Sequence, residues 1–349
     1  MASILTGTPV TYAGEQAKEY TLIPALNVGG LELFFKVLTK VKVKQQVLLL
    51  GILDKITQAD AGCGQGENSK AIPRSEKFWI PEDLKAWVSQ CWKDLKSTFE
   101  EGMLNGGNGK ADVSDTAIMD VVLPILISAA GRDLVRLAFL GNKTLVSGNM
   151  TSGVSAADYT GVNGIWKRIL DGVGAATITR VTIAKNAATT LAGQVLDAGE
   201  AKTILQSVLR KSKTVLKQRD KKTLKFIVTR SIWENYEDYL IANDKLETAW
   251  MKMQDGSDQL QFMGIPLEIA DVLDEYLAAD FNPTGTAVTN PHRVILTVQD
   301  NLQVALDTDS NDPTAFDVWY EKKDEKVNAR LTYKMDTQVA HDQLVTVAY

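Results

Sequence analysis

Short hydrophobic segments with a period of two follow one another through the C-terminal part of the chain, from His292 to Tyr349. Residues 294–298 alternate in this way, and residues 302–306 resume the same period. The dipeptide Asp300-Asn301 between them has the chemistry of a turn. The pattern predicts a β-hairpin.

Three more strands are predicted beyond this hairpin. Residues 316–320 carry Phe, Val and Tyr at alternate positions, and residues 344–348 form a short apolar segment. Between them, residues 327–336 alternate apolar and polar side chains without a break. Such alternation is typical of an antiparallel strand with one face in water. None of these segments contains a nucleophile, a metal-ligand cluster or a phosphate-binding loop.

Helical spacing dominates the middle of the chain. Residues 117–138 carry one apolar stripe at i, i+3 and i+4 spacing, with a kink or restart expected at Pro124 and an end at Gly141. Two further helices are predicted from capping boxes, in which a polar side chain is followed three residues later by Glu. The boxes are Asp197 with Glu200 and Ser231 with Glu234.

The order of the later segments resembles a known family. The sequence Lys225–Arg230 predicts a strand, a helix opens at Ser231, and Gly264-Ile265-Pro266-Leu267 follows before the C-terminal strands. This order is similar to that of the major capsid proteins of tailed bacteriophages, which have the Hong Kong-type capsid fold. The resemblance covers the C-terminal half of the chain well and the N-terminal half loosely.

The resemblance implies an α+β fold with an N-terminal arm, an extended loop, a peripheral domain with a long spine helix and antiparallel strands, and an axial domain. The expected divisions are residues 1–56 for the arm and the start of the peripheral domain, 57–104 for the extended loop, 105–172 for the peripheral domain with its spine helix, 173–291 for the axial domain, 292–338 for the long peripheral strands, and 339–349 for a closing strand that returns to the axial domain.

Two interpretations conflict between residues 81 and 100. Pro81 opens a segment in which Leu84, Trp87, Val88 and Cys91 follow helical spacing, and this spacing predicts a helix that continues to residue 99. The family resemblance places the strands of the extended loop in the same region. We expect helical character from the spacing and leave the extended-loop strand open as the alternative.

Composition narrows the class of protein. The chain has 349 residues, of which 45% are hydrophobic and 23% charged, and this is the profile of a folded protein rather than a disordered one. The net charge of −5 argues against a protein whose main task is to coat nucleic acid. We expect the two cysteines, Cys63 and Cys91, to be free thiols in a cytosolic protein. No secretory signal is expected, because the N-terminal residues 1–5 run straight into polar residues, and no membrane anchor is expected, because the longest apolar run, residues 121–130, is too short to span a bilayer.

Catalytic and cofactor motifs are not recognisable. The two histidines, His292 and His341, lack the spacing of a zinc site, and we expect both to have surface or turn roles. Residues 105–110 lack both the first glycine and the final Ser or Thr of a phosphate-binding loop. We therefore predict no enzyme activity, no catalytic or metal-binding residues, and no cofactor.

One basic run is the only candidate contact site. Its members are Arg210, Lys211, Lys213, Lys217, Arg219, Lys221, Lys222 and Lys225. Nucleic-acid contact is one interpretation. The favoured alternative is a solvated surface, or pairing with an acidic patch on a neighbouring subunit. The acidic residues considered for that patch are Asp271, Asp274, Glu275 and Asp280.

The resemblance implies a structural protein that assembles into the icosahedral head of a tailed phage around double-stranded DNA. Its expected partners are copies of itself in hexamers and pentamers, portal, scaffold or decoration proteins, and DNA bound without sequence specificity, but no membrane. The expected location is the virion capsid, after assembly in the bacterial host cytoplasm. The alternatives are an encapsulin-like nanocompartment shell and a nucleic-acid-binding oligomer that uses the basic run.

Overall fold

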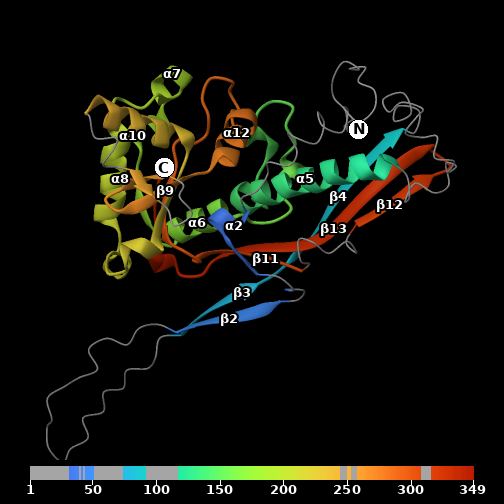
Figure 1. Ribbon diagram of the computed structural model, residues 1–349, viewed down its shortest axis with the longest axis horizontal. Coiled ribbons are helices and arrows are strands. Elements are labelled where there is room, and N and C mark those ends of the chain that lie inside the picture. The colour runs from blue at the N-terminus through green and yellow to red at the C-terminus, as the bar shows by residue number, and fades with distance from the viewer. Residues whose placement is uncertain are drawn as a thin grey trace, which may run out of the picture.

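The computed structural model describes residues 31–38, 41, 44–50, 74–91, 117–243, 250–252, 258–307 and 316–349. Within them the chain forms two larger sheets, each with its own helices, and one separate two-stranded ribbon (Figure 1). The predicted N-terminal arm and most of the predicted extended loop lie outside the described residues.

The five-stranded sheet is organised around its longest strand, β13. Its members are β1 (Lys36–Leu38), β4 (Glu82–Cys91), β11 (Leu302–Leu306), β12 (Phe316–Glu321) and β13 (Lys326–Val339). One edge of β13 pairs with β4 over ten residues, and its other edge pairs first with β12 and then with β11. β1 extends the sheet by pairing in parallel with β11. The predicted strands at 302–306, 316–320 and 327–336 are therefore confirmed.

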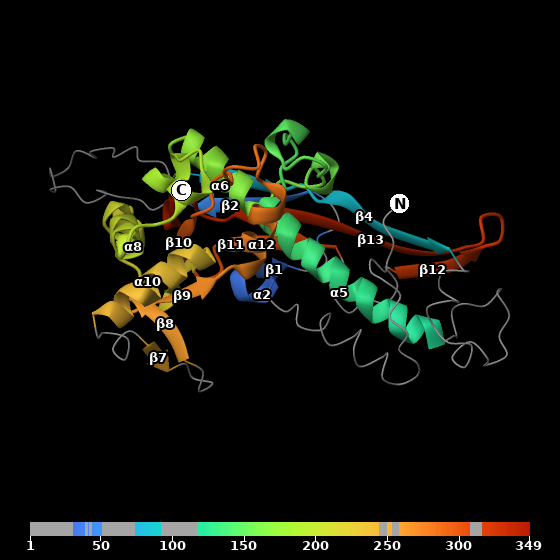
Figure 2. The same ribbon diagram turned by 90° about the horizontal axis from the view of Figure 1, so that it is seen from above.

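Helix α5 (Ala117–Leu140) runs beside the long strands of this sheet (Figures 1 and 2). The helix is continuous through Pro124, so the predicted spine helix is confirmed but the expected restart at this proline is wrong. Its C-terminal end is anchored by Phe139, whose ring lies 5.3 Å from that of Phe34 and 4.6 Å from that of Phe35. The short helix α2 (Leu31–Phe34) is thereby held against α5. Gly141 directly follows the end of α5, as predicted.

The seven-stranded sheet forms the second body, in the order β5-β14-β10-β6-β9-β8-β7. Its strands are β5 (Thr179–Val181), β6 (Leu224–Val228), β7 (Trp250–Lys252), β8 (Asp258–Phe262), β9 (Ile265–Ile269), β10 (Val294–Val298) and β14 (Val345–Ala348). The helices of this part of the chain are α6 (Ile165–Gly174), α7 (Leu191–Gln194), α8 (Glu200–Lys211), α9 (Thr214–Lys217), α10 (Arg230–Ala242) and α12 (Asp271–Asp280), of which α6 and α12 also contact α5. Short 3-10 turns η1 (Ser147–Asn149), η2 (Ala156–Asp158), η3 (Ala184–Ala187), η4 (Lys221–Thr223) and η6 (Asp342–Leu344) complete the described elements.

The predicted hairpin between residues 294–298 and 302–306 is wrong. β10 pairs with β6 and β14 in the seven-stranded sheet, whereas β11 belongs to the five-stranded sheet. The burial of β10 gives the reason: Val294, Ile295, Leu296 and Thr297 are all buried, as expected for a central strand covered on both faces. Both edges of β10 are already paired, with β6 and β14, so β11 cannot pair with it, and Asp300-Asn301 is instead the crossing point between the sheets.

The predicted helix at residues 84–99 is also wrong over its described part. Residues 82–91 form β4, in which Leu84, Ala86 and Val88 are less exposed than Lys85 and Trp87. This period of two coexists with the helical spacing in the same sequence. The ladder with β13 decides between them, because it gives the backbone partners that a strand at a sheet edge requires.

The two predicted capping boxes have different outcomes. Half of the first box is present, because the Asp197 backbone N–H donates to the Glu200 carboxylate at 3.0 Å, but the N-cap of α8 is Gly199 and no side chain caps it. The second box is wrong, because α10 begins at Arg230, before Ser231. The Ser231 hydroxyl is instead hydrogen-bonded to His292.

Candidate assembly surfaces

A two-stranded ribbon projects from the body of the chain. β2 (Gln45–Leu50) and β3 (Arg74–Trp79) pair with each other in antiparallel register, and neither joins the two larger sheets (Figure 1). An isolated two-stranded ribbon is at best marginally stable in water. The ribbon therefore requires additional packing partners along its length.

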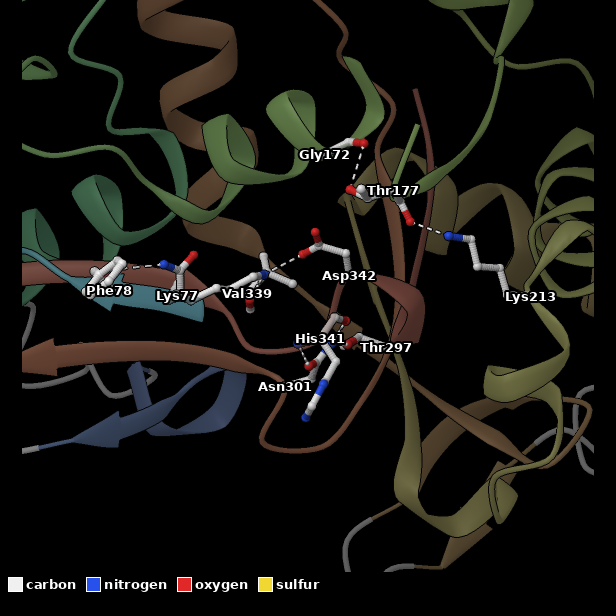
Figure 3. Close-up of polar contacts among 11 residues, drawn as sticks. Lys77, Phe78, Gly172, Thr177, Lys213, Thr297, Asn301, Val339, His341 and Asp342 are labelled. Carbon is white, nitrogen blue, oxygen red and sulfur yellow. Dashed lines mark hydrogen bonds and ion pairs between the residues drawn. The ribbon is translucent and has the colours of Figure 1, made fainter. Parts of the chain in front are cut away.

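The root of this ribbon is fixed to the body. The Trp79 side chain is 3% exposed and clusters with Val41 and Ala305. The Lys77 ammonium donates to the Val339 carbonyl oxygen at 2.5 Å and to the Asp342 carboxylate at 2.6 Å (Figure 3). Apolar and charged contacts together hold β3 against the end of β13.

A buried carboxylate fixes the chain between β3 and β4. Asp336 is 1% exposed and accepts hydrogen bonds from the Ile80 backbone N–H at 2.8 Å and from the Arg168 guanidinium at 3.1 Å. Its neighbour Thr337 donates a third bond from its backbone N–H. Burial raises the pKa of Asp336, while these donors and the Arg168 charge act in the opposite direction. The carboxylate therefore links the ribbon root, α6 and β13.

Asn301 ties together the two places where the chain passes between sheets. One crossing joins β10 to β11, and the other joins β13 to β14. The Asn301 side chain is buried; its Oδ1 accepts from the His341 N–H at 2.8 Å, and its Nδ2 donates to the His341 carbonyl and to the Thr297 hydroxyl, both at 3.1 Å (Figure 3). One amide therefore holds both crossings at a fixed separation.

The basic run does not form one continuous free surface. Lys225 is 8% exposed, pairs with Glu268 at 3.2 Å and donates to the Leu33 carbonyl oxygen at 2.7 Å. Its inclusion in an exposed contact site was wrong, because it lies on the central strand β6. Three other lysines donate to backbone carbonyls of this chain. They are Lys213 to Thr177, Lys217 to Arg210 and Lys221 to Met263.

Six cations of the run are exposed, and for four of them neither an ion pair nor a hydrogen bond to a carbonyl oxygen is found among the described residues. These four are Arg210, Lys211, Arg219 and Lys222. They lie at the end of α8, after α9 and in η4. The sequence therefore located a basic surface but overstated its size.

The acidic residues suggested as its partners already have other uses. Asp271 pairs with Arg230 at 2.6 Å, and Asp274 accepts from the Arg230 backbone N–H at 2.7 Å. Glu275 pairs with Arg132 at 2.5 Å, and Asp280 accepts from the Tyr159 hydroxyl. These four residues are therefore already hydrogen-bonded or ion-paired within their own chain.

The two histidines differ. His341 is exposed in a turn, as expected, but His292 is 5% exposed, so its expected surface role was wrong. The His292 Nε2 lies 2.5 Å from the Gln194 carbonyl oxygen and its Nδ1 lies 2.7 Å from the Ser231 hydroxyl. Burial lowers the pKa of His292, which favours the neutral ring. The His292 ring therefore links the C-terminal end of α7 to α10.

Neither Asn301 nor Asp336 was identified as important from the sequence. Asp336 occupies a polar position in the alternation of β13, where solvent exposure is the ordinary expectation. Asn301 belongs to the dipeptide Asp300-Asn301, whose residue types are typical of an exposed turn. Nothing in the sequence around either residue signals that its side chain is buried.

Among the described residues, no group of His, Cys, Asp and Glu side chains is arranged to hold a metal ion. Their helices include none with the length and hydropathy needed to cross a membrane. Cys91 is a free thiol, as predicted, whereas Cys63 lies outside this part of the chain.

Comparisons with known proteins identify the fold. No protein-family model and no curated protein matches the sequence. Among solved structures, a chain of the satellite phage P4 procapsid aligns over 97% of this chain and 91% of its own length, with 12% identity and a TM-score of 0.55. A chain of Gordonia phage Cozz aligns over 99% and 89%, with 9% identity and a TM-score of 0.50. An encapsulin complex from Synechococcus elongatus PCC 7942 aligns over 99% and 91%, with 10% identity and a TM-score of 0.49.

The alignments span nearly the whole chain, including both larger sheets and the spine helix. The chain therefore has the fold of the phage capsid proteins that its sequence resembles.

Proposed function

We propose that this chain is a structural shell subunit that assembles with many copies of itself into the icosahedral head of a tailed phage and encloses double-stranded DNA. The observation that carries the proposal is the β2–β3 ribbon, in a chain with the fold of phage capsid proteins. The ribbon is anchored rigidly at its root by Lys77 and Trp79 but joins neither larger sheet of its own chain. A neighbouring subunit supplies the missing packing surface.

The energetics of such assembly are additive. An obligate interface buries on the order of 2,000–5,000 Å² in total. At about 25 cal/mol per Å² of apolar surface, this burial contributes tens of kcal/mol before the entropic cost of association. Each contact of a ring is repeated in every copy, so a closed shell is much harder to dissociate than any one pair of subunits.

The charge of the chain suits a container for DNA. Its net charge of −5 provides little attraction to phosphates as a whole. Packaged DNA must remain removable, so weak, sequence-independent contact with the shell wall is sufficient. Under this proposal the chain has no catalytic role, and its partners beyond itself are a portal and scaffold or decoration proteins in the bacterial host.

Light scattering followed by negative-stain electron microscopy of the purified chain tests the proposal. Closed particles, tubes or hexameric sheets are the expected result. A monomer or dimer that never assembles, even under crowding, would refute shell formation.

The content of particles recovered from cells distinguishes the phage head from the encapsulin-like alternative. Nuclease-protected double-stranded DNA is expected for a phage head. A co-purified cargo enzyme without DNA would instead support a nanocompartment.

A further inference from the structure

A groove between α7 and α10 combines apolar and acidic walls. Its volume is about 410 Å³. Leu191 and Val195 line one side and are 51% and 64% exposed, and Glu234 and Asp238 line the other. Glu234 has only a distant partner, Arg230 at 3.7 Å, and no ion-pair partner is found for Asp238 among the described residues. The groove is therefore apolar, negatively charged and open.

The walls of this groove are fixed in place. The His292 ring bridges Gln194 and Ser231, as described above, and thus joins α7 to α10. The Gln194 side chain also donates to the Val288 carbonyl at 2.7 Å and accepts from the Val288 N–H at 3.0 Å. A preformed site binds a partner at a lower entropic cost than one that must first be ordered.

A positively charged surface lies at the C-terminal end of α8. Arg210 and Lys211 end α8, and Arg219 and Lys222 follow α9, which the Lys217 ammonium links to the Arg210 carbonyl oxygen. The Lys221 ammonium donates to the Met263 carbonyl at 3.0 Å and brings the β8–β9 turn beside them. The Met263 side chain is 55% exposed. We call these four cations together with Met263 the basic patch.

Helix α8 separates the two surfaces. Its N-terminus adjoins the groove, because the Ala201 N–H donates to the Asn235 side chain at 3.0 Å, and Asn235 lines the groove. Its last residues, Arg210 and Lys211, belong to the basic patch. The helix has 12 residues, which at about 1.5 Å per residue gives a length of about 18 Å. In Figure 1, α7 lies at the top of this body and α8 runs down its left side.

We propose that the acidic groove of one copy receives the basic patch of the next copy, with Met263 entering between Leu191 and Val195. This inference rests on the proposed shell assembly and names the surfaces that join its subunits. Both the sign of charge and the apolar character of the two surfaces are complementary. Different surfaces at opposite ends of one body form a head-to-tail contact, and such contacts close into rings when the rotation between copies is suitable.

Charge reversal tests the contact in a way that distinguishes repulsion from misfolding. The groove variant carries Glu234→Lys and Asp238→Lys, and the patch variant carries Arg210→Glu, Lys211→Glu, Arg219→Glu and Lys222→Glu, so that its patch becomes acidic. Each variant alone places like charges across every contact, so at low salt we expect at least about a tenfold rise in the protein concentration needed for assembly, equivalent to about 1.4 kcal/mol. The variant with all six changes restores opposite charges and is the matched control.

Mixing the two variants gives a sharper result. In an alternating ring, the basic groove of one variant meets the acidic patch of the other, and every contact is again attractive. Alternation closes only in rings with an even number of copies. We therefore expect the mixture to form hexameric sheets or tubes but no closed shells, because closed shells require pentamers.

Cross-linking of wild-type particles with a zero-length carbodiimide provides a measurement that needs no variant. The expected product joins a peptide containing Glu234 or Asp238 to one containing Lys211 or Lys222. Wild-type shells that lack this product, and assemble equally well in all four charge states, would overturn the inference while leaving shell assembly intact. A wild-type chain that never assembles would remove both proposals. DNA binding lost in the patch variant, with assembly unchanged, would assign the patch to nucleic acid instead.

Discussion

Replacement of Asn301 by Ala should destabilise the chain at the crossing between its two sheets. The substitution removes three side-chain hydrogen bonds, one with the His341 N–H, one with the His341 carbonyl and one with the Thr297 hydroxyl. A neutral hydrogen bond contributes about 1 kcal/mol net, so three give a loss of about 3 kcal/mol. The actual loss depends on how well water replaces the amide, and Asn301 is only 4% exposed.

Urea denaturation of the unassembled chain, followed by tryptophan fluorescence, measures this loss. Asn149→Ala is the matched control, because Asn149 is exposed and no hydrogen bond of its side chain is found in the described part of the chain. The control should stay within about 0.5 kcal/mol of wild type. Asn301→Asp should also be destabilised at neutral pH, since its charged oxygen faces the His341 carbonyl, and should recover in acid as the carboxyl becomes protonated.

Amide hydrogen exchange gives a local readout of the same change. Exchange at His341 and Ala340 should accelerate in Asn301→Ala, because the first N–H loses its acceptor and the second is bonded to the Asn301 backbone carbonyl. A free energy of unfolding within about 0.5 kcal/mol of wild type, together with unchanged exchange at both amides, would refute the role assigned to Asn301.

Three further predictions concern buried ionisable groups. Lys225→Met should cost about 3–5 kcal/mol in urea denaturation because it strands the Glu268 carboxylate, and adding Glu268→Leu should recover most of the loss; equal losses in the two variants would contradict this. His292 has a lowered pKa, so its contribution to stability is present above its ordinary value of 6.5 and is lost as the pH falls below it; His292→Gln should show a smaller fall in melting temperature between about pH 7 and about pH 5. Burial raises the pKa of Asp274 to about 6, so its contribution is present below 3.8 and is lost as the pH rises through about 6. Asp274→Asn should therefore gain stability relative to wild type from acid to neutral pH, by on the order of 3 kcal/mol, and a constant difference in melting temperature would exclude this.

The order of elements along the chain could be predicted from the sequence, whereas their pairing could not. The strands at 302–306 and 327–336 and the helix at 117–138 have periodic patterns long enough to determine their type. Periodicity does not say which strand lies beside which. β10 is followed closely by β11, yet β10 pairs with β6, which lies about seventy residues earlier, because burial on both faces is available only at the centre of the larger sheet.

The error at residues 84–91 has a related cause. Leu84, Trp87, Val88 and Cys91 fit a helix, and Leu84, Ala86 and Val88 fit a strand equally well. Local propensity does not separate the two structures when both patterns are present, and the ten-residue ladder with β13 decides the outcome. The family resemblance was the better guide here, because it includes the tertiary context that local spacing lacks.

The candidate site shows the same limit for polar residues. The sequence identified the basic run, but neither the burial of Lys225 nor the acidic groove follows from spacing. The groove is formed by α7, α10 and the segment before β10, which are far apart in the chain. The acidic residues that the sequence suggested, those of α12, are instead bound to their own chain.

Under the proposed shell function, the buried polar groups lie where the geometry of the subunit is set. Asp336 lies where the chain turns from the ribbon root into β4, and Asn301 lies where it passes between the sheets. Apolar residues of similar volume could fill both positions, but dispersion and hydrophobic contacts depend little on direction. Hydrogen bonds to fixed backbone donors set the angle as well as the distance. In a closed assembly, a small error in the angle between ribbon and body, or between the two sheets, is repeated at every subunit, so the cost of burying these groups is offset by the accuracy of closure.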